Sequence, residues 1–225
     1  MFFDEKSVIL KDMNDFIRAR TDGQKEIRMK EIKAAADSIF SKMPFSDITL
    51  TAIAENLGWS RANLYKYVTT KEEIFLAISE EKMDGYFASL NAAFPDGNKY
   101  SPEVVAEVWA GILNANQEYL RYSAILTSII EKNVTIERLA VFKKKYYDAA
   151  FAFCGKLSEM LKIEKDSAYA LFLHVLFYSG SSASSCEKNP LIQEAVKRIQ
   201  VAPPKVDFYE DLRDFILMEI KWRTK

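Results

Sequence analysis

Glycine and proline are scarce in this sequence, with seven Gly and six Pro among 225 residues. No segment alternates Val, Ile or Thr with polar residues in the way that half-buried strands do. Both absences argue against a sheet. Hydrophobic residues nevertheless make up 49% of the chain, which is enough to bury a sizeable core. The composition therefore predicts an all-α protein.

Long apolar runs and closely spaced cysteines are also missing. No stretch reaches the roughly 18 uninterrupted apolar residues of a membrane span, and residues 1–5 lack the basic-then-apolar order of a signal peptide. Cys154 and Cys186 are too few and too far apart for a disulfide framework or a CxxC metal site, so we expect two reduced, partly buried thiols. These features predict a cytoplasmic protein with no membrane partner, no bound metal and no cofactor.

Catalytic patterns are absent from the sequence as well. There is one histidine, His174, and no Ser/His/Asp or Cys/His order around it. A Gly-rich phosphate loop and a constellation of metal ligands are likewise missing. A helical enzyme is therefore the least favoured function, and we expect a protein that is not an enzyme.

The charge of the chain is nearly balanced. Because the net charge is −1, DNA binding cannot be argued from overall basicity and must rest on a local patch. Such a patch exists: residues 57–71 contain the basic residues Arg61, Lys66 and Lys71 and no acidic residue, whereas acidic and basic residues are interspersed elsewhere. This segment is the candidate for contact with nucleic acid.

The same segment has the turn and capping residues of a helix-turn-helix. Thr49 can cap a first short helix, a glycine follows that helix, and Ser60 can cap a second short helix that runs to about Tyr67. After them, the run Thr70–Glu73 has the form of a capping box that opens a longer helix to about Asn91. Two short helices joined by a Gly-containing turn of about three or four residues are typical of the motif.

The helix-breaking and loop residues elsewhere in the chain predict the domain organisation. Apolar residues recur at helical spacing from Asp4 to Arg20, Thr21-Asp22-Gly23 breaks this pattern, and a second helical pattern runs from Gln24 to Met43. The clearest loop is Phe94–Asn98. We expect an N-terminal extension helix over residues 1–21, a helix-turn-helix domain over 22–75 whose connecting helix continues to about 91, and a larger helical domain over 92–225. The extension helix could pack on its own domain or add DNA contacts.

An ordered set of residues between Ile32 and Phe75 resembles the DNA-binding domain of the tetracycline-repressor (TetR) family. The matching residues are Ala35-Ala36, Phe40, Phe45, Ile48-Thr49, Ile53-Ala54, Leu57-Gly58, Ser60-Arg61-Ala62-Asn63-Leu64-Tyr65-Lys66-Tyr67 and Thr70-Lys71-Glu72-Glu73. The chain departs from the family pattern at Trp59, where Val is usual, and at Val68, where Phe is usual. Both changes stay apolar and should preserve the core.

The resemblance implies a dimer in which the helix Ser60–Tyr67 enters the major groove. It also implies phosphate contacts from Thr49, Tyr67 and Lys71. The side-chain chemistry agrees, because Arg61 and Asn63 can make bidentate bonds to guanine and adenine, and Ala62 is small enough to approach a thymine methyl. Tyr65 and Lys66 can reach a base edge or a phosphate.

Three of these candidate DNA-binding residues have a simpler interpretation. Ser60 can serve as an N-cap with or without a phosphate contact. Lys71 can be a solvated charge, and Tyr65 can be a packing residue. Leu64 faces partly away from Arg61, and we assign it to the core.

For the larger domain, the resemblance implies a dimer interface made by the last long helices. Small residues would let helices approach closely, and the apolar face of the last helix could complete a four-helix dimer bundle. The predicted interface residues are Gly180, Ser181, Ala183, Ser184, Phe208, Leu212, Phe215 and Ile216. The alternative is that both faces pack within one subunit.

The resemblance also implies a sensory pocket in each subunit. Aromatic residues with a few polar groups suit a mostly apolar cleft. The candidates are Trp109, Asn116, Gln117, Tyr119, Tyr122, Tyr146, Phe153, His174 and Tyr178. An aromatic stripe can equally be core, and a lone histidine such as His174 can be a satisfied core or interface residue.

These features together favour a ligand-responsive transcriptional regulator. We expect a repressor that binds a palindromic operator in double-stranded DNA as a homodimer, and that an unidentified small apolar or amphipathic effector releases. The residues fit an activator as well. A protein-interaction module that keeps the helix-turn-helix without binding DNA is the main alternative, and the acid-free patch argues against it.

Overall fold

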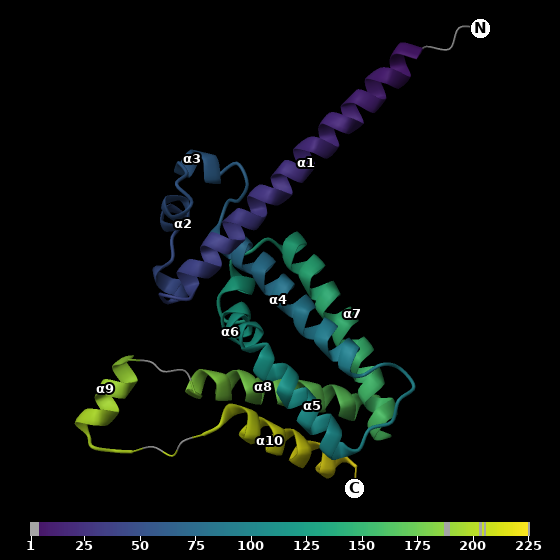
Figure 1. Cartoon of the computed structure of the whole chain (residues 1–225), viewed down its shortest axis with the longest axis vertical. Helices are drawn as coiled ribbons and strands as arrows, with labels where there is room; N and C mark the ends of the chain where they lie inside the picture. The colour runs from purple at the N-terminus through teal and green to yellow at the C-terminus, as the bar shows by residue number, and fades with distance from the viewer. Residues whose placement is uncertain (1–4, 187–189, 203, 205, 225) are drawn as a thin grey trace. The chain divides into compact units, whose positions relative to one another are not determined.

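The computed structural model describes the backbone of residues 5–186, 190–202, 204 and 206–224, and the side chains from residue 23 onward except those of 184–192, 203, 205 and 225. The described residues form helices and no strand, so the predicted all-α class is confirmed (Figure 1). The α-helices are α1 (Glu5–Phe40), α2 (Leu50–Asn56), α3 (Arg61–Leu64), α4 (Lys71–Ala93), α5 (Pro102–Ala115), α6 (Gln117–Leu126), α7 (Ile136–Leu161), α8 (Lys165–Cys186), α9 (Pro190–Arg198) and α10 (Phe208–Arg223). Short 3₁₀ helices cover Phe45–Asp47 and Ile130–Lys132. None of the described helices is long and apolar enough to cross a membrane.

The chain divides into two compact units, Met1–Ile78 and Ser79–Lys225. The loop expected at 94–98 is present between α4 and α5, but the division falls earlier, inside α4. The first turns of α4 therefore pack with the helix-turn-helix, and the remainder of α4 packs with the C-terminal helices.

The N-terminal segment is one helix, so the predicted break at Thr21–Gly23 is wrong. Helix α1 runs without interruption from Glu5 to Phe40. A glycine inside a helix costs about 1 kcal/mol relative to alanine, which a long helix can tolerate. At its other end, α1 stops at Phe40 rather than at Met43, and Ser41–Met43 form a turn before Pro44.

The first unit has a small apolar core. One face of α1 is buried at Ile32, Ala35, Ala36, Ile39 and Phe40. Two rings pack edge-on with Phe75 of α4: Phe40, with ring centroids 5.4 Å apart, and Phe45, with ring centroids 4.9 Å apart. Ile53 and Ala54 of α2 and Leu64 of α3 are fully buried. This core fixes the elements that carry the helix-turn-helix.

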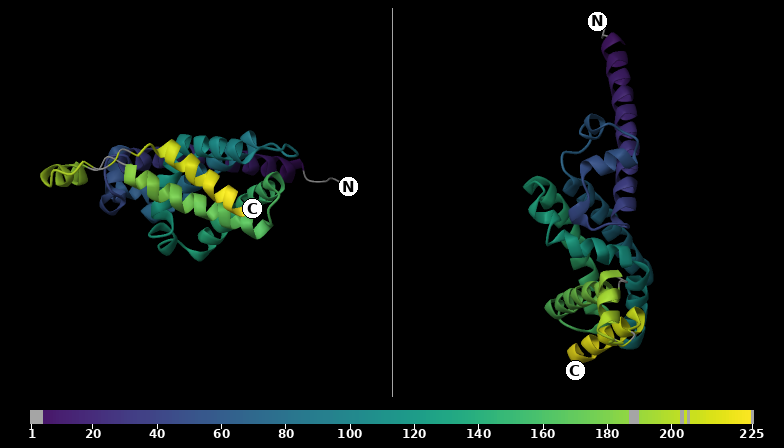
Figure 2. Two further views of the ribbon diagram at one scale, coloured as in Figure 1. Left: turned by 90° about the horizontal axis from the view of Figure 1, so that it is seen from below. Right: turned by 90° about the vertical axis from the view of Figure 1, so that its left-hand side faces the viewer.

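In the second unit, α10 packs against both α5 and α8 (Figures 1 and 2). Leu212, Ile216 and Ile220 are completely buried in that contact, and Phe208 is 8% exposed. The prediction that Phe208, Leu212 and Ile216 form the dimer interface is therefore wrong: their apolar face is already covered by helices of the same subunit.

Candidate nucleic-acid interface

The turn between α2 and α3 is a complete Schellman motif. The Gly58 N–H donates to the Glu55 carbonyl at 3.0 Å, and the Trp59 N–H donates to the Ala54 carbonyl at 2.9 Å. Gly58 has a φ of +66°, a left-handed conformation that only glycine adopts without strain. The sequence thus ends α2 abruptly and turns the chain into α3.

Both short helices are capped as the sequence predicts. The Thr49 hydroxyl accepts the Ala52 N–H at 3.1 Å, and the Ser60 hydroxyl accepts the Asn63 N–H at 3.2 Å. The Thr70 hydroxyl likewise accepts the Glu73 N–H at the start of α4. The Glu73 carboxylate, however, reaches back to the Thr69 N–H at 3.0 Å, one residue before the expected partner.

Helix α3 is shorter than predicted. It ends at Leu64, and the chain continues to Tyr67 in turns, because the Lys66 and Tyr67 N–H groups bond carbonyls three residues back rather than four. Leu64 is buried, as the sequence predicted. This buried residue fixes which side of α3 faces inward.

The outward side of α3 carries the predicted contact residues. Arg61, Ala62 and Lys66 are exposed, and Tyr65 is 48% exposed, so Tyr65 is a surface residue rather than part of the core. Thr49 and Ser60 are exposed as well, whereas Asn63 and Tyr67 are half-buried. Within the described part of the chain, no acidic side chain pairs with Arg61 or Lys66. This surface therefore carries positive charge that is accessible to solvent.

Lys71 has a role that the sequence did not indicate. Its Nζ donates to the Phe45 carbonyl at 2.8 Å and to the Ile48 carbonyl at 2.7 Å, and it lies 4.3 Å from the centroid of the Phe45 ring. These contacts tie the first turn of α4 to the segment before α2. One of the three ammonium N–H groups remains for another acceptor.

A set of side-chain contacts beside α3 was not predicted from the sequence. The Trp59 ring packs against the Tyr67 ring at 5.8 Å, and the Arg28 guanidinium of α1 lies 5.3 Å from the centroid of Trp59. The only signal in the sequence was the replacement of the usual Val by Trp59.

The predicted pocket residues come together only in part. Trp109 and Phe153 meet edge-on at 5.3 Å in a buried aromatic cluster, and Tyr119 stacks on Tyr86 at 4.6 Å within it. Tyr122 is buried, and Tyr146 is half-buried beside Phe87. The polar candidates lie elsewhere: Asn116 donates to the Ile112 carbonyl at the end of α5, and Gln117 is exposed and bonds Asn114.

His174 and Tyr178 belong to the contact between α8 and α10. His174 is exposed, with its Nδ1 3.0 Å from the Glu219 carboxylate and 3.2 Å from Arg223. Tyr178 donates to Asp211 at 2.6 Å and stacks on Phe215 at 3.8 Å. The polar atoms of His174 and Tyr178 thus bind α10 rather than the aromatic cluster around Trp109.

The aromatic cluster is hydrogen-bonded internally. The Trp109 indole N–H donates to the Tyr86 hydroxyl at 2.8 Å. Burial raises the pKa of Tyr119 to about 12 and raises the pKa of Tyr86 well above its ordinary value. Burial also raises the pKa of the Cys154 thiol to about 12, so this cysteine stays protonated. These groups are neutral, as a packed core requires.

A capped helix pair around a Schellman turn, with an exposed cationic surface on the second helix, defines a helix-turn-helix DNA-binding regulator. Residues 32–78 match the family described as "Bacterial regulatory proteins, tetR family", and residues 80–221 match "Tetracyclin repressor-like, C-terminal domain". The chain therefore belongs to the TetR family of transcriptional regulators.

Solved structures agree in fold at low sequence identity. The regulator PfmR from Thermus thermophilus is 16% identical, with 85% of this chain and 97% of that chain covered and a TM-score of 0.53. A TetR/AcrR family regulator from Thermobifida fusca is 16% identical, with 84% and 96% covered and a TM-score of 0.55. The fatty acid degradation regulator FadR from Bacillus halodurans is 13% identical, with 84% and 94% covered and a TM-score of 0.54. No curated protein sequence matches this chain significantly.

Proposed function

We propose that the protein is a transcriptional repressor that binds a palindromic operator as a homodimer and leaves it when a small effector binds. The observation that carries DNA recognition is the outward side of α3, where Arg61, Tyr65 and Lys66 are exposed without an acidic partner among the described residues. Arg61 is suited to a guanine edge, and Asn63 to an adenine edge. Thr49, Ser60, Tyr67 and Lys71 are the proposed phosphate contacts around them.

One copy of this surface can discriminate only weakly between DNA sequences. Each bidentate base contact contributes about 1–3 kcal/mol, so a single four-residue helix binds weakly. Two copies, placed on successive major grooves by a two-fold axis, double the contacts and explain why a palindrome is needed. A dimer is therefore part of the recognition mechanism.

The outer side of the α8–α10 pair is the proposed dimer interface. Phe177 of α8 is 70% exposed, and Met218 and Trp222 of α10 are 58% and 67% exposed, so this helix pair presents large apolar side chains to solvent. Gly180 has open space beside it, so a partner helix can approach there. Two such pairs would form a four-helix bundle across the two-fold axis. Of the residues that the sequence predicted, Gly180, Ser181, Ala183 and Phe215 remain in this proposal, and Ser184 lies outside the described side chains.

The effector would bind in the second unit by displacing part of its packed aromatic cluster. Apolar rings with a few hydroxyl and indole groups, such as Tyr86 and Trp109, suit an apolar or amphipathic molecule. An effector that binds one conformation of this unit more tightly can shift the dimer away from the spacing that DNA requires. This property would make the protein ligand-responsive.

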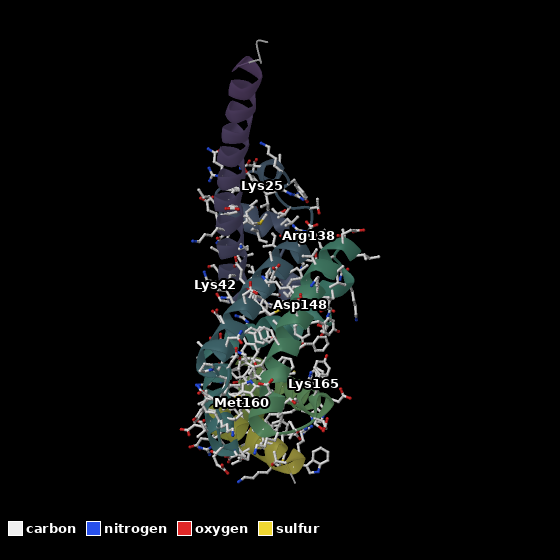
Figure 3. The ribbon with its side chains drawn as sticks, turned by 90° about the vertical axis from the view of Figure 1, so that its right-hand side faces the viewer. Lys25, Lys42, Arg138, Asp148, Met160 and Lys165 are labelled. Carbon is white, nitrogen blue, oxygen red and sulfur yellow. The ribbon has the colours of Figure 1, made fainter. Side chains whose placement is uncertain are left out.

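The first experiment selects bound fragments from the source genome and measures their affinity by mobility shift. Arg61→Ala should abolish detectable binding to the selected duplex, whereas Arg138→Ala, in the first turn of α7 (Figure 3), should bind as the wild type does. A reporter behind the selected duplex separates repression from activation. Wild-type binding by Arg61→Ala would refute the DNA assignment, and absence of salt-dependent binding by the wild type would favour a protein-interaction module.

The second experiment measures mass in solution by sedimentation. Phe177→Glu should turn the dimer into a monomer, because a charge would be buried at the proposed interface. Ile136→Glu, at a residue that is 81% exposed on α7, is the matched control and should stay dimeric. A dimeric Phe177→Glu variant would place the interface elsewhere.

A further inference from the structure

Two aromatic rings stand at the two ends of α3. Trp59 directly precedes the N-cap residue Ser60, and Tyr67 lies three residues beyond Leu64, where the helix ends. Their ring centroids are 5.8 Å apart. The Trp59–Tyr67 contact therefore joins the segment before α3 to the segment after it, and α3 carries the proposed base-reading side chains.

A side chain of α1 joins this contact. The Arg28 guanidinium lies 5.3 Å from the centroid of the Trp59 ring and pairs with Glu31, one turn further along α1, at 2.8 Å. The bond to Glu31 raises the pKa of Arg28, with a smaller effect of Tyr67 in the same direction. Arg28 over the Trp59 ring, with the Tyr67 ring tilted against Trp59 by 44°, forms a set of contacts that connects α1 to both ends of α3 and is called the stack below.

Helix α3 needs such support. A helix of four residues has no stability of its own, since isolated helices shorter than about 12 residues are marginal in water. Its orientation depends on tertiary contacts, of which buried Leu64 supplies the one in the middle. The stack supplies the contacts at the ends. A valine, which is usual in the family at the position of Trp59, has no ring face for a guanidinium.

We propose that Arg28, acting through Trp59 and Tyr67, is a positioning residue that holds α3 in the orientation required to read bases. The inference rests on the proposed DNA recognition by α3. Bidentate contacts to base edges demand a defined geometry, whereas phosphate contacts tolerate variation. Loosening the stack therefore lowers discrimination between operator and other DNA, and leaves non-specific binding unchanged.

The test compares Arg28→Lys and Arg28→Met with the wild type. Lysine keeps the charge but loses the planar group that stacks on an aromatic ring, and methionine loses the charge as well. The probes are a genomic duplex selected by the wild type and a scrambled duplex of the same length. Both variants should lower the ratio of the two affinities roughly three- to ten-fold, with the same salt slope as the wild type. Arg138→Lys is the matched control.

Three outcomes would overturn the proposal. An unchanged affinity ratio in both variants shows that α3 does not depend on Arg28. A wild-type ratio in Arg28→Lys with a lower ratio in Arg28→Met shows that only the charge matters. A salt slope reduced by about one in Arg28→Met shows that Arg28 itself contacts a phosphate.

A DNA-free measurement keeps the proposal separate from the proposed function. Hydrogen exchange at the Leu64 and Tyr65 amides of the free protein should be roughly two- to five-fold faster in Arg28→Lys and in Trp59→Val. If the wild type binds no duplex, the proposed function fails, and the exchange rates still decide whether Arg28 positions α3. Unchanged exchange in Arg28→Lys, whose side chain is 49% exposed in the wild type and therefore tolerant of substitution, would contradict the stack's role.

Discussion

The surface of α3 and the aromatic cluster of the second unit use similar side chains in opposite ways. At α3, the charge of Arg61 on the four-residue helix and the ring of Tyr65, its C-cap residue, are exposed to solvent. In the cluster, Tyr86 and Trp109 are completely buried and bond each other. An exposed tyrosine next to cations is available for contact with another molecule, whereas a buried tyrosine with an internal partner stabilises the fold. The environment of the side chain therefore decides its role.

The largest expected effect tests whether the cluster is a packed core. Trp109→Ala should lower the free energy of unfolding by about 3–5 kcal/mol, because it leaves a cavity and removes the partner of the Tyr86 hydroxyl. Urea denaturation followed by circular dichroism measures the loss. Ile136→Ala, at a residue that is 81% exposed, should change stability by about 0.5 kcal/mol or less. A loss below about 1 kcal/mol in Trp109→Ala would mean that the ring lines a loose cavity.

The next prediction separates the two lysines at the DNA-binding surface. Lys71→Met should lower the stability of the first unit by about 1.5–3 kcal/mol, because two carbonyls lose a charged donor. Lys66→Ala, at an exposed position on the same side of the chain, should leave stability unchanged and weaken DNA binding with a salt slope reduced by about one. Equal stability of the two variants would show that the carbonyl contacts of Lys71 contribute nothing.

The sequence predicted α3 and its surroundings better than the second unit because those signals are local. The caps at Thr49 and Ser60 and the turn at Gly58 each depend on a few neighbouring residues, and the structure has all of them. The apolar spacing of α10 likewise indicated that Leu212 and Ile216 are buried. It could not indicate what covers them, since periodicity identifies a face and not its partner. Helix α5 of the same chain covers that face.

Long-range side-chain contacts escaped prediction for the same reason. The carbonyls that bind Lys71 lie more than 20 residues earlier, and Arg28 of α1 reaches Trp59 in the turn between α2 and α3. Nothing in the spacing of these residues brings them together; the packing of α1 and α4 does. The uninterrupted course of α1 through Gly23 has a different cause. The helical residues on both sides of the glycine outweigh its local cost in free energy.

Alkaline pH should weaken the aromatic cluster. The folded state holds the pKa of Tyr119 at about 12, above its ordinary value of 10, because the neutral phenol is buried. This group's contribution is therefore fully present below pH 10 and is lost as the pH rises from 10 toward 12, by about 2 kcal/mol. Urea denaturation at about pH 9 and about pH 11.5 measures the fall. Tyr119→Phe should make the fall smaller, and an identical fall in both proteins would contradict the prediction.

The smallest effect separates folding from binding at a single residue of α3. Ser60→Ala should cost about 1 kcal/mol of stability, because the Asn63 N–H loses its acceptor. Ser60→Asp keeps an N-cap acceptor and should retain stability, but it places a negative charge beside the proposed phosphate and should weaken DNA binding more than Ser60→Ala does. Denaturation and mobility shift on both variants measure the two effects. Wild-type affinity in Ser60→Asp would mean that the Ser60 end of α3 does not approach the DNA backbone, and the duplex would then have to be met by the exposed Arg61, Tyr65 and Lys66 without a phosphate at Ser60.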